Sequence, residues 1–272
     1  MGAKTGGKKK KAGKVLLIIL AVILLLAGFL TFHAVRNTKT MNNLIREGLH
    51  SVEMRYDVTP LDAGEYKDMR FYGLMKFHVD QYRVEELGNL SVMTANMGMM
   101  QMVSFMITPF EKNVPLCTLD FMYIMGNRKS YVEFYDLVGD TATPEYQQVL
   151  ESLRTGVQFY SDIEEIPAEE HWYDSYLSVV MHKKLKGSDE DRNRELFLNM
   201  LEIYLESSKT LEKSAPEDAE RQFEITQNYS DGLIEKGGVS TDVFKKALGE
   251  EKTRDFFNRV FFGTDNYRTE KQ

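Results

Sequence analysis

One carboxyl group interrupts an otherwise apolar stretch of the sequence. Asp120 lies within "LCTLDFMYIM", residues 116–125, where β-branched, aromatic and methionine side chains predict a strand. Alternation along a strand puts Thr118, Asp120 and Met122 on one face. A carboxyl group held against apolar surface favours its neutral form, so it can donate a proton near neutral pH. Because an acid has no evident packing use there, we interpret Asp120 as a candidate proton donor that faces a pocket.

A methionine-rich stretch precedes this strand. Six of the 15 methionines fall within "MTANMGMMQMVSFMITP", residues 93–109, which also contains Ser104. Side chains along a strand alternate between its two faces. Because methionine adapts to irregular shapes, the residues on one face, which include Met102, could form the floor of a pocket for a flat apolar ligand. Ordinary core packing on both faces of a central strand explains the same composition. Binding of Cu(I) by thioethers is less favoured, because strand geometry spreads the sulfur atoms over both faces and no histidine accompanies them.

The cysteine, histidine and serine residues of the sequence argue against a disulfide, a metal site and a serine nucleophile. The single cysteine, Cys117, rules out an internal disulfide and a cysteine-rich metal centre. The five histidines are scattered, with no i, i+4 pair on a helix, so no metal site is expected. Ser104, Ser178 and Ser230 all lack the context of a nucleophile elbow.

The first 35 residues differ in kind from the rest. Six lysines fall within residues 1–14, and the uncharged run "VLLIILAVILLLAGFLTFHAV" follows at 15–35. A helix of roughly 20 apolar residues crosses the hydrocarbon core of a bilayer, so we predict a basic tail at 1–14 and a transmembrane anchor at 15–35. A cleaved signal peptide is the alternative. Its apolar core is usually shorter, about 7–15 residues, and no clean Ala-x-Ala site follows here.

The charge distribution predicts topology and partners. Six lysines before the span, against Arg36 and Lys39 just after it, predict a cytoplasmic N-terminus and a domain on the outer side of the cell membrane. The tail can also lie on anionic headgroups. The chain has a net charge of −7, so the part after the tail has −13. Nucleic-acid binding depends on clustered Lys and Arg, so no nucleic-acid partner is expected.

Residues 41–272 are sufficient for one domain with a substantial core. A short helical pattern over 40–52 is followed by five strand-like runs with short connections, which favours antiparallel pairing. These runs are 69–84, 90–97, 99–108, 116–125 and 130–137. We interpret the acidic segment 164–176 as a solvated loop that enters a helix, with its Trp172 as an alternative lid over a ligand.

Helical patterns dominate the second half of the chain. Thr143 before Pro144 predicts the start of one helix, Ser214 and Glu217 form a capping box at another, and Gly249 is a natural C-terminal cap for a third. Strands first and helices afterwards predict an α+β domain in which helices cover an antiparallel sheet.

The order of these segments resembles the ferredoxin-dependent bilin reductases. In "MQMVSFMITPFEKNVPLCTLDFM" an apolar strand ends at Pro109, a second proline follows at Pro115, and Asp120 comes five residues later. The next strand, "YVEFYDL", is similar to the family's following strand with its Asp-Leu ending. The closing "STDVFKKALGEEKTRDFFNRVFFG" resembles the family's pattern of a helix, a glycine corner and a helix that finishes Val-Leu-Phe. The resemblance covers residues 99–137 and 239–263.

The resemblance implies an α/β/α sandwich in which an open-chain tetrapyrrole, a bilin, lies between the sheet and the C-terminal helices. Such enzymes bind no metal or flavin; an external ferredoxin or flavodoxin delivers single electrons and side chains donate protons. The aspartate at the position of Asp120 is a key proton donor in that scheme. We therefore expect Asp120 as the catalytic residue and Met102, Ser104, Thr118 and Met122 as substrate-binding residues.

The sequence also departs from the family pattern. Ser104 occupies a position where some members have histidine and others usually asparagine. A family His-x-Glu pair falls near Leu90 and Val92, and an Asn-Asp pair maps onto Gly237 and Gly238. Loss of these donors favours an alternative function, a noncatalytic tetrapyrrole or apolar-ligand binding domain. An outward-facing domain also counts against the enzyme, because ferredoxins and flavodoxins are expected in the cytoplasm. A purely structural anchor predicts no pocket beside the retained aspartate.

Overall fold

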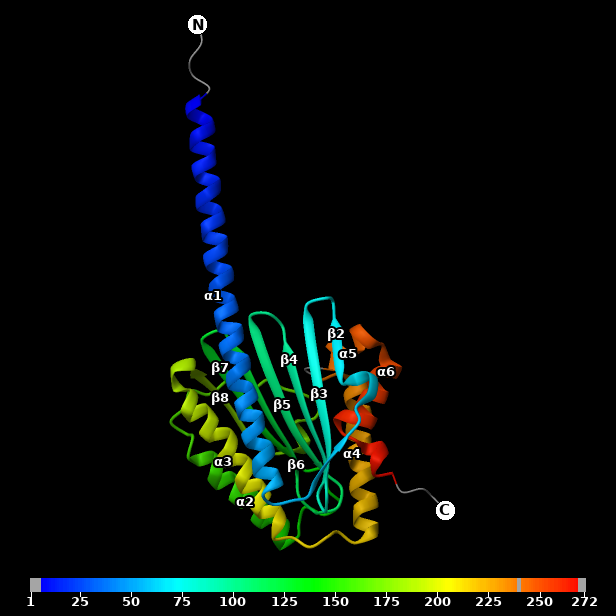
Figure 1. Ribbon diagram of the computed structural model, residues 1–272. Helices are drawn as coiled ribbons and strands as arrows, with labels where there is room; N and C mark the ends of the chain where they lie inside the picture. The colour runs from blue at the N-terminus through cyan, green and yellow to red at the C-terminus, as the bar shows by residue number, and fades with distance from the viewer. Residues whose placement is uncertain (1–5, 239–240, 269–272) are drawn as a thin grey trace.

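A single long helix begins the structure. The computed structural model describes residues 6–238 and 241–268, so the first five residues of the basic tail lie outside the described part. Helix α1, Gly6–Glu53, contains both the predicted anchor and the helical segment predicted at 40–52. Its N-terminal half projects from the body and its C-terminal part lies on the sheet (Figure 1). The helix is long and apolar enough to cross a membrane, and none of its most apolar window is buried.

An antiparallel sheet of eight strands forms the centre of the domain. The strands are β1 (Val58–Leu61), β2 (Asp68–Phe71), β3 (Met75–Val84), β4 (Gly88–Asn96), β5 (Met100–Pro109), β6 (Leu116–Ile124), β7 (Asn127–Tyr135) and β8 (Leu177–Lys186). Their order is β1-β3-β4-β5-β6-β7-β8, and β2 also pairs with β3. From β2 to β7 each strand pairs with the next one in the chain, as short connections require.

Helices cover both faces of this sheet (Figure 1). One face packs against α1, α2 (Pro144–Gln158) and α3 (Glu190–Lys209); the other packs against α4 (Pro216–Lys236), α5 (Thr241–Leu248), α6 (Glu250–Phe256) and the π-helical turn Phe257–Phe261. Short 3₁₀ turns occupy Gly64–Tyr66, Asp174–Tyr176, Gly187–Asp189 and Thr264–Asn266. The predicted fold is therefore confirmed: an α+β sandwich with a central antiparallel sheet, preceded by a helix of transmembrane length.

Strands β1 and β8 were not predicted from the sequence, and one predicted strand run forms two strands in the structure. The run 69–84 forms two strands, because Tyr72 and Gly73 take positive φ angles of 51° and 72° and make a hairpin turn. β1 contains a proline and pairs only with β3, at the edge of the sheet. β8 alternates between buried and accessible positions, but its three lysines make this alternation hard to recognise in the sequence. Segment 164–176, predicted to enter a helix, leads into β8 instead.

The helix ends agree with prediction at two of three sites. The Thr143 hydroxyl caps α2 by accepting a hydrogen bond from the Tyr146 amide at 3.3 Å. Gly249 ends α5 with a φ of 82°, which a residue with a side chain rarely adopts. The capping box at Ser214 is wrong, because α4 starts one residue later with Ala215 at the cap position. The Ser214 amide instead donates to the Glu111 carbonyl at 2.9 Å, which holds Ser214 outside the helix.

Polar side chains of the sheet hold the π-helical turn in place. The last carbonyl groups of a helix have no amide partner within the helix, and buried carbonyls need donors. Three residues of β3 and β4 supply them: Gln81 Nε2 donates to Arg259 O at 2.8 Å, Asn89 Nδ2 to Val260 O and Phe261 O at 3.2 Å each, and Ser91 Oγ to Phe261 O at 2.9 Å. These bonds attach the C-terminal segment to the sheet.

We predict that Asn89→Leu destabilises this attachment. The side chain of Asn89 is fully buried, so leucine leaves two buried carbonyls with fewer donors and lowers the free energy of unfolding by about 2–4 kcal/mol. Denaturant unfolding of the full chain in detergent, followed by circular dichroism, measures this. The control is Asn127→Leu at the exposed first position of β7, which should change the midpoint little. Equal midpoints for the two variants would show that the bonds contribute nothing.

Candidate functional site

A cavity of about 300 Å³ lies between the sheet and the C-terminal helices. That volume is at the lower end of the range of roughly 300–1,000 Å³ found for ligand pockets. Strands β4 to β8 form its floor. Its other walls come from α4, the π-helical turn and the loop before β8, through Ile166, Pro167, Glu169, His171, Tyr173, Tyr229, Leu233, Phe257, Phe261 and Phe262. The lining is therefore mainly apolar and aromatic, with a few titratable groups.

The structure places all five of the predicted site residues on the wall of this cavity. Met102 and Ser104 come from β5, and Thr118, Asp120 and Met122 come from β6. Strand alternation explains why they share one face. The presence of a cavity beside Asp120 counts against a purely structural anchor. The catalytic and binding roles of these residues remain predictions.

The methionines of the stretch 93–109 lie in two parts of the structure, the cavity floor and the hairpin between β4 and β5. Met93, Met102 and Met106 lie on the floor of the cavity. Met97 and Met99 lie instead at the hairpin between β4 and β5. The pocket interpretation thus describes one alternating set only, because Met97 packs against the core under the C-terminal helices and Met99 is exposed at the hairpin.

Pairing across the sheet brings four polar residues into one row. Ser104 of β5 lies opposite Asp120 of β6, Asp120 lies opposite Tyr131 of β7, and Tyr131 lies opposite His182 of β8. Glu133, two positions along β7 from Tyr131, is a diagonal neighbour of both Asp120 and His182. Diagonal neighbours on a sheet are within reach of long side chains.

Asp120 has the chemistry of a proton donor that works near neutral pH. Its Oδ1 atom is buried and has no hydrogen-bond partner among the described residues, although part of the side chain is accessible from the cavity. Burial raises the pKa of Asp120 to about 7, and the negative charge of Glu133 adds to that effect. The Ser104 hydroxyl and the His182 ring act in the opposite direction. The group is thus poised to release and to accept a proton near pH 7.

Glu133 connects the other titratable groups of the cavity. His182 Nε2 lies 2.7 Å from Glu133 Oε1, and the Tyr135 hydroxyl donates a hydrogen bond to the other carboxylate oxygen. The rings of Tyr131 and His182 meet edge to face with centroids 4.9 Å apart. Burial raises the pKa of Tyr135 well above its usual value, so its hydroxyl stays protonated and acts as a donor.

The sequence analysis did not identify Glu133 or His182 as site residues. The sequence contains a pattern that could have identified Glu133 but none that could have identified His182. The predicted strand 130–137 already placed Tyr131, Glu133 and Tyr135 on one face by alternation, so Glu133 was open to recognition. His182 belongs to the unpredicted strand β8 and had no context. Only the pairing of β7 with β8 brings it beside Glu133.

We predict that Glu133→Gln lowers the pKa of Asp120, because the variant removes a negative charge that disfavours ionisation of the aspartate. Infrared difference spectra over a pH series can follow the carbonyl band of the protonated Asp120, with Asp120→Asn to assign that band. Glu169→Gln is the matched control, since Glu169 also lines the cavity but is not among the groups that shift Asp120. An unchanged titration midpoint in Glu133→Gln would rule out the coupling.

The positions of the family donors that this sequence lacks lie in two places, and one of them, Gly238, lines the cavity. Leu90 and Val92 are buried on the other side of the sheet, in the core shared with α1 and α3. The Gly237 carbonyl accepts a hydrogen bond from Trp172 Nε1 at 2.7 Å, so Trp172 packs on the end of α4 and does not line the cavity among its described residues. The ring of Trp172 packs against those of Tyr173 and Tyr229, which line the cavity, and its role as a lid stays a prediction.

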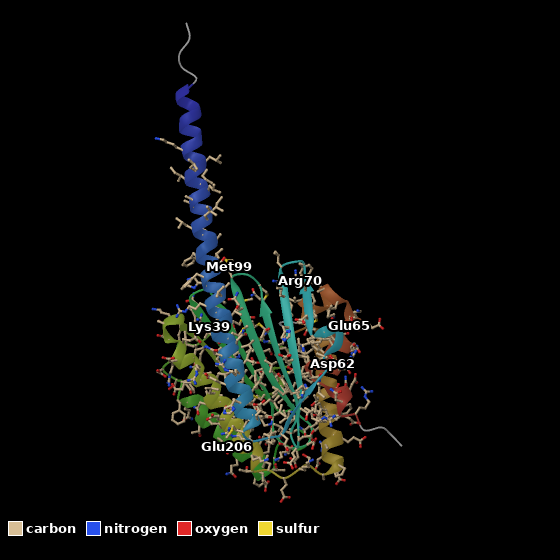
Figure 2. The ribbon with its side chains drawn as sticks, in the orientation of Figure 1. Lys39, Asp62, Glu65, Arg70, Met99 and Glu206 are labelled. Atoms are coloured by element: carbon tan, nitrogen blue, oxygen red, sulfur yellow. The ribbon has the colours of Figure 1, made fainter. Side chains whose placement is uncertain are left out.

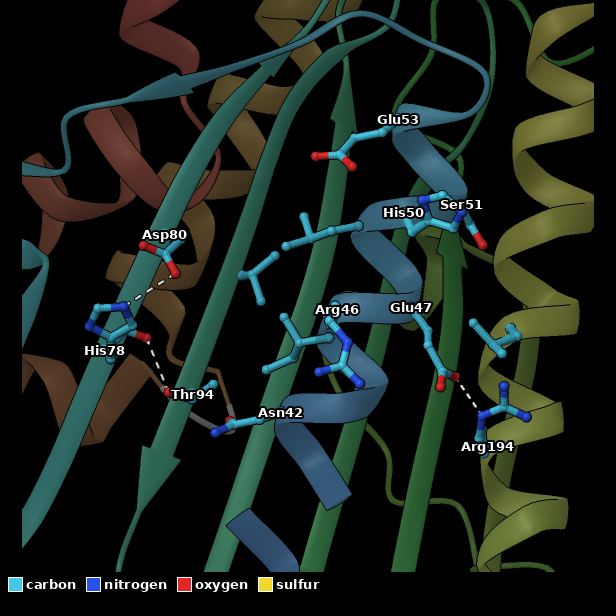
Figure 3. Close-up of a pocket in the computed structure, with 14 residues that line it drawn as sticks. Asn42, Arg46, Glu47, His50, Ser51, Glu53, His78, Asp80, Thr94 and Arg194 are labelled. Carbon is cyan, nitrogen blue, oxygen red and sulfur yellow. Dashed lines mark hydrogen bonds and ion pairs between the residues drawn. The ribbon is translucent and has the colours of Figure 1, made fainter. Parts of the chain in front are cut away.

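A larger groove, of about 910 Å³, lies on the opposite face between α1 and strands β3 and β4. Figure 3 shows two pairs among its charged groups: His78 with Asp80, and Glu47 with Arg194 at the facing helices. His78 also lies 2.8 Å from Asp68. Its lining has fewer aromatic groups and no carboxyl comparable to Asp120, so we take the smaller cavity as the candidate site. Among the described residues, no group of three or more His, Cys, Asp or Glu side chains could hold a metal ion.

The fold and its cavity define a three-layer α/β/α protein with an acid-bearing site between sheet and helices. No protein-family model matches the chain, and no curated protein matches it in sequence. Among solved structures, it is similar to phytochromobilin synthase from tomato in complex with biliverdin, with a TM-score of 0.69 and 13% sequence identity. The match covers 84% of this chain and 85% of that one. At this identity the similarity establishes the fold.

Proposed function

We propose that the protein binds an open-chain tetrapyrrole in the Asp120 cavity and reduces it. A separate ferredoxin or flavodoxin supplies the electrons, and Asp120 supplies protons. One observation carries the proposal: a carboxyl group with a buried, unpartnered oxygen and a pKa near 7 lines an apolar, aromatic cavity. The similarity in fold to a biliverdin complex supports the choice of ligand.

Reduction of one double bond consumes two electrons and two protons. Asp120 is the group that gives a proton to the bilin. His182, hydrogen-bonded to Glu133 and partly exposed at the rim, is placed to return a proton to Asp120 from solvent. The two protons of one reduction can then pass through the same carboxyl group in succession, each after transfer of one electron from the external donor.

The charge of the cavity constrains how a bilin would bind. Asp120, Glu133 and Glu169 are among its described lining residues, and no Lys or Arg is. Propionate groups prefer cationic partners, so the propionates should extend out of the cavity toward solvent. The pyrrole nitrogens should lie inside, because carboxyl groups accept hydrogen bonds from N–H groups.

We also propose that α1 anchors the protein to the cell membrane as a single span. The helix has the required length and apolar composition. The excess of lysines before the span predicts a cytoplasmic N-terminus and a domain on the other side of the membrane. In that topology the electron donor must be a redox protein on the same side as the domain.

An alternative function is binding without reduction. The positions of other family donors are taken by leucine, valine and glycine, and the predicted outward orientation separates the domain from cytoplasmic ferredoxins. A carrier or sensor of a tetrapyrrole would need the same cavity but no electron donor. The two functions differ in one property, which is whether the bound ligand changes its redox state.

Binding is tested by anaerobic titration of the full chain, in detergent, with biliverdin while visible absorption is recorded. We expect a shifted band that saturates at one ligand per chain and then bleaches or moves when a ferredoxin reducing system is added. Thr118→Trp should fill the cavity and abolish the shift. Val180→Trp, at an exposed position of β8, is the control and should bind normally. A saturating shift without further change would favour the carrier, and no shift in the parent chain would refute both functions.

A further inference from the structure

Large apolar side chains are exposed at two hairpins of the sheet. Tyr72 and Leu74, between β2 and β3, are 64% and 81% exposed, and Met99, between β4 and β5, is 55% exposed. Among the described residues after Val35, comparable exposure is found for large apolar side chains only at Met54, Phe159 and Val180. Half of this exposed apolar surface is therefore concentrated at two neighbouring hairpin tips.

Both tips lie at the end of the sheet from which α1 projects. The hairpins β2–β3 and β4–β5 point the same way as the free half of the helix (Figure 1). Met99 lies beside α1 in Figure 2, closer to its projecting half than Lys39 is. The polypeptide thus directs its exposed apolar tips toward the region that the apolar helix occupies.

Hydrogen bonds fix the height of the β4–β5 tip relative to the helix. Asn37 is buried, and its Nδ2 donates to the Met125 carbonyl at 3.1 Å and to Gln101 Oε1 at 3.2 Å. Met99 lies two residues from Gln101 toward the hairpin tip, a distance of about 7 Å along a strand. The same distance along a helix corresponds to roughly four to five residues. Met99 therefore reaches the level of the last turn of the apolar run 15–35.

The residues around the tips suit the boundary between headgroups and acyl chains. Tyrosine is enriched at membrane interfaces, and leucine and methionine can enter the acyl region. Arg70 of β2 and Lys76 of β3 occupy facing positions on the two strands, next to the Tyr72 turn. Their positive charges could bind anionic headgroups there. This local positive charge contrasts with the acidic net charge of the domain.

We infer that the two hairpin tips insert into the surface of the bilayer that α1 crosses, so that the domain is seated on the membrane in one orientation. The inference rests on the proposed anchor and is independent of bilin chemistry. The apolar side chains supply hydrophobic burial, and the basic residues at the β2–β3 hairpin supply attraction to anionic lipid. Together with α1 they give three points of attachment, which fix both the tilt and the rotation of the domain.

The test uses the full chain with one added cysteine that carries an environment-sensitive fluorophore. The native Cys117 is fully buried and does not compete for label. Leu74→Cys and Met99→Cys report on the tips, and Phe29→Cys reports on the span. Met54→Cys is the matched control, since Met54 is 69% exposed but lies at the opposite end of the α1 segment that packs on the domain. Each chain is reconstituted into vesicles of phosphatidylcholine and phosphatidylglycerol.

We expect lipids with a nitroxide near the headgroup to quench both tip probes at least twofold more than the Met54 probe. Aqueous iodide should quench the tip probes at least threefold less. Tip probes that behave like Met54, with Phe29 buried in lipid, would overturn the seating while leaving the anchor intact. Tips shielded from both quenchers would indicate a protein contact and also overturn it. A Phe29 probe that is open to iodide would overturn the anchor and the seating together, without bearing on bilin reduction.

Discussion

Asp120→Asn is expected to retain the bilin and to lower its rate of reduction at least 100-fold at pH 7. Asparagine keeps the size and polarity of the side chain, so the shape of the cavity is preserved. It cannot donate a carboxyl proton, and general acid catalysis typically contributes about 10²- to 10⁴-fold to a rate. Single-turnover absorption spectroscopy of the full chain, with saturating biliverdin and a ferredoxin reducing system, measures both properties. Electron transfer can proceed in the variant, so a bilin radical should persist long enough for electron paramagnetic resonance.

The matched control for this prediction is Asp80→Asn. Asp80 lies on the opposite face of the sheet, in the open groove, and pairs with His78. Its replacement removes one carboxyl group without touching the cavity, so the rate should stay within about twofold of the parent rate. Reduction by Asp120→Asn at the parent rate would show that another group is the proton donor.

The second large effect is on stability as a function of pH. The pKa of Asp120 is raised from 3.8 to about 7 in the folded protein, so the folded state binds more protons than the unfolded state between these values. The free energy of unfolding should therefore fall as the pH rises from about 4 through 7. Three pKa units correspond to about 4 kcal/mol, and access of water from the cavity reduces this to about 2–4 kcal/mol.

Asp120→Asn should remove this dependence, because asparagine does not titrate. The variant is expected to match the parent near pH 4 and to be more stable by about 2–4 kcal/mol at pH 8. Denaturant unfolding of both proteins at a series of pH values gives the difference, in which the contributions of all other groups cancel. Thr118→Val changes a neighbour that does not titrate, so its difference from the parent should be independent of pH. A flat difference for Asp120→Asn would mean that the carboxyl is ionised in the fold throughout this range.

Patterns local to a strand or a helix end were predictable from the sequence. Alternation in 116–125 placed Thr118, Asp120 and Met122 on one face, and the structure has them on one cavity wall. Thr143 and Gly249 were recognised as helix ends because their side chain or its absence determines the backbone geometry. The order of strands before helices was sufficient for the fold class.

Features that depend on distant contacts were not predictable. Ser214 has the sequence context of a cap, but a bond from its amide to Glu111 keeps it outside α4. His182 became part of the site only through the pairing of β8 with β7, since its own strand is rich in lysine. The division of the methionine-rich stretch between a cavity floor and a hairpin tip depends on where the β4–β5 turn falls. That turn is set by a glycine with a φ of 75° at position 98.

The mass of the bilin recovered after an anaerobic reaction tests the central claim most directly. The full chain is saturated with biliverdin, supplied with a ferredoxin reducing system, and the extracted pigment is analysed by mass spectrometry. The proposed reductase predicts a product heavier by two hydrogens per reduced double bond, formed by the parent chain and not, on the same time scale, by Asp120→Asn. Recovery of unchanged biliverdin from a saturated parent chain would contradict the account and leave a ligand-binding protein.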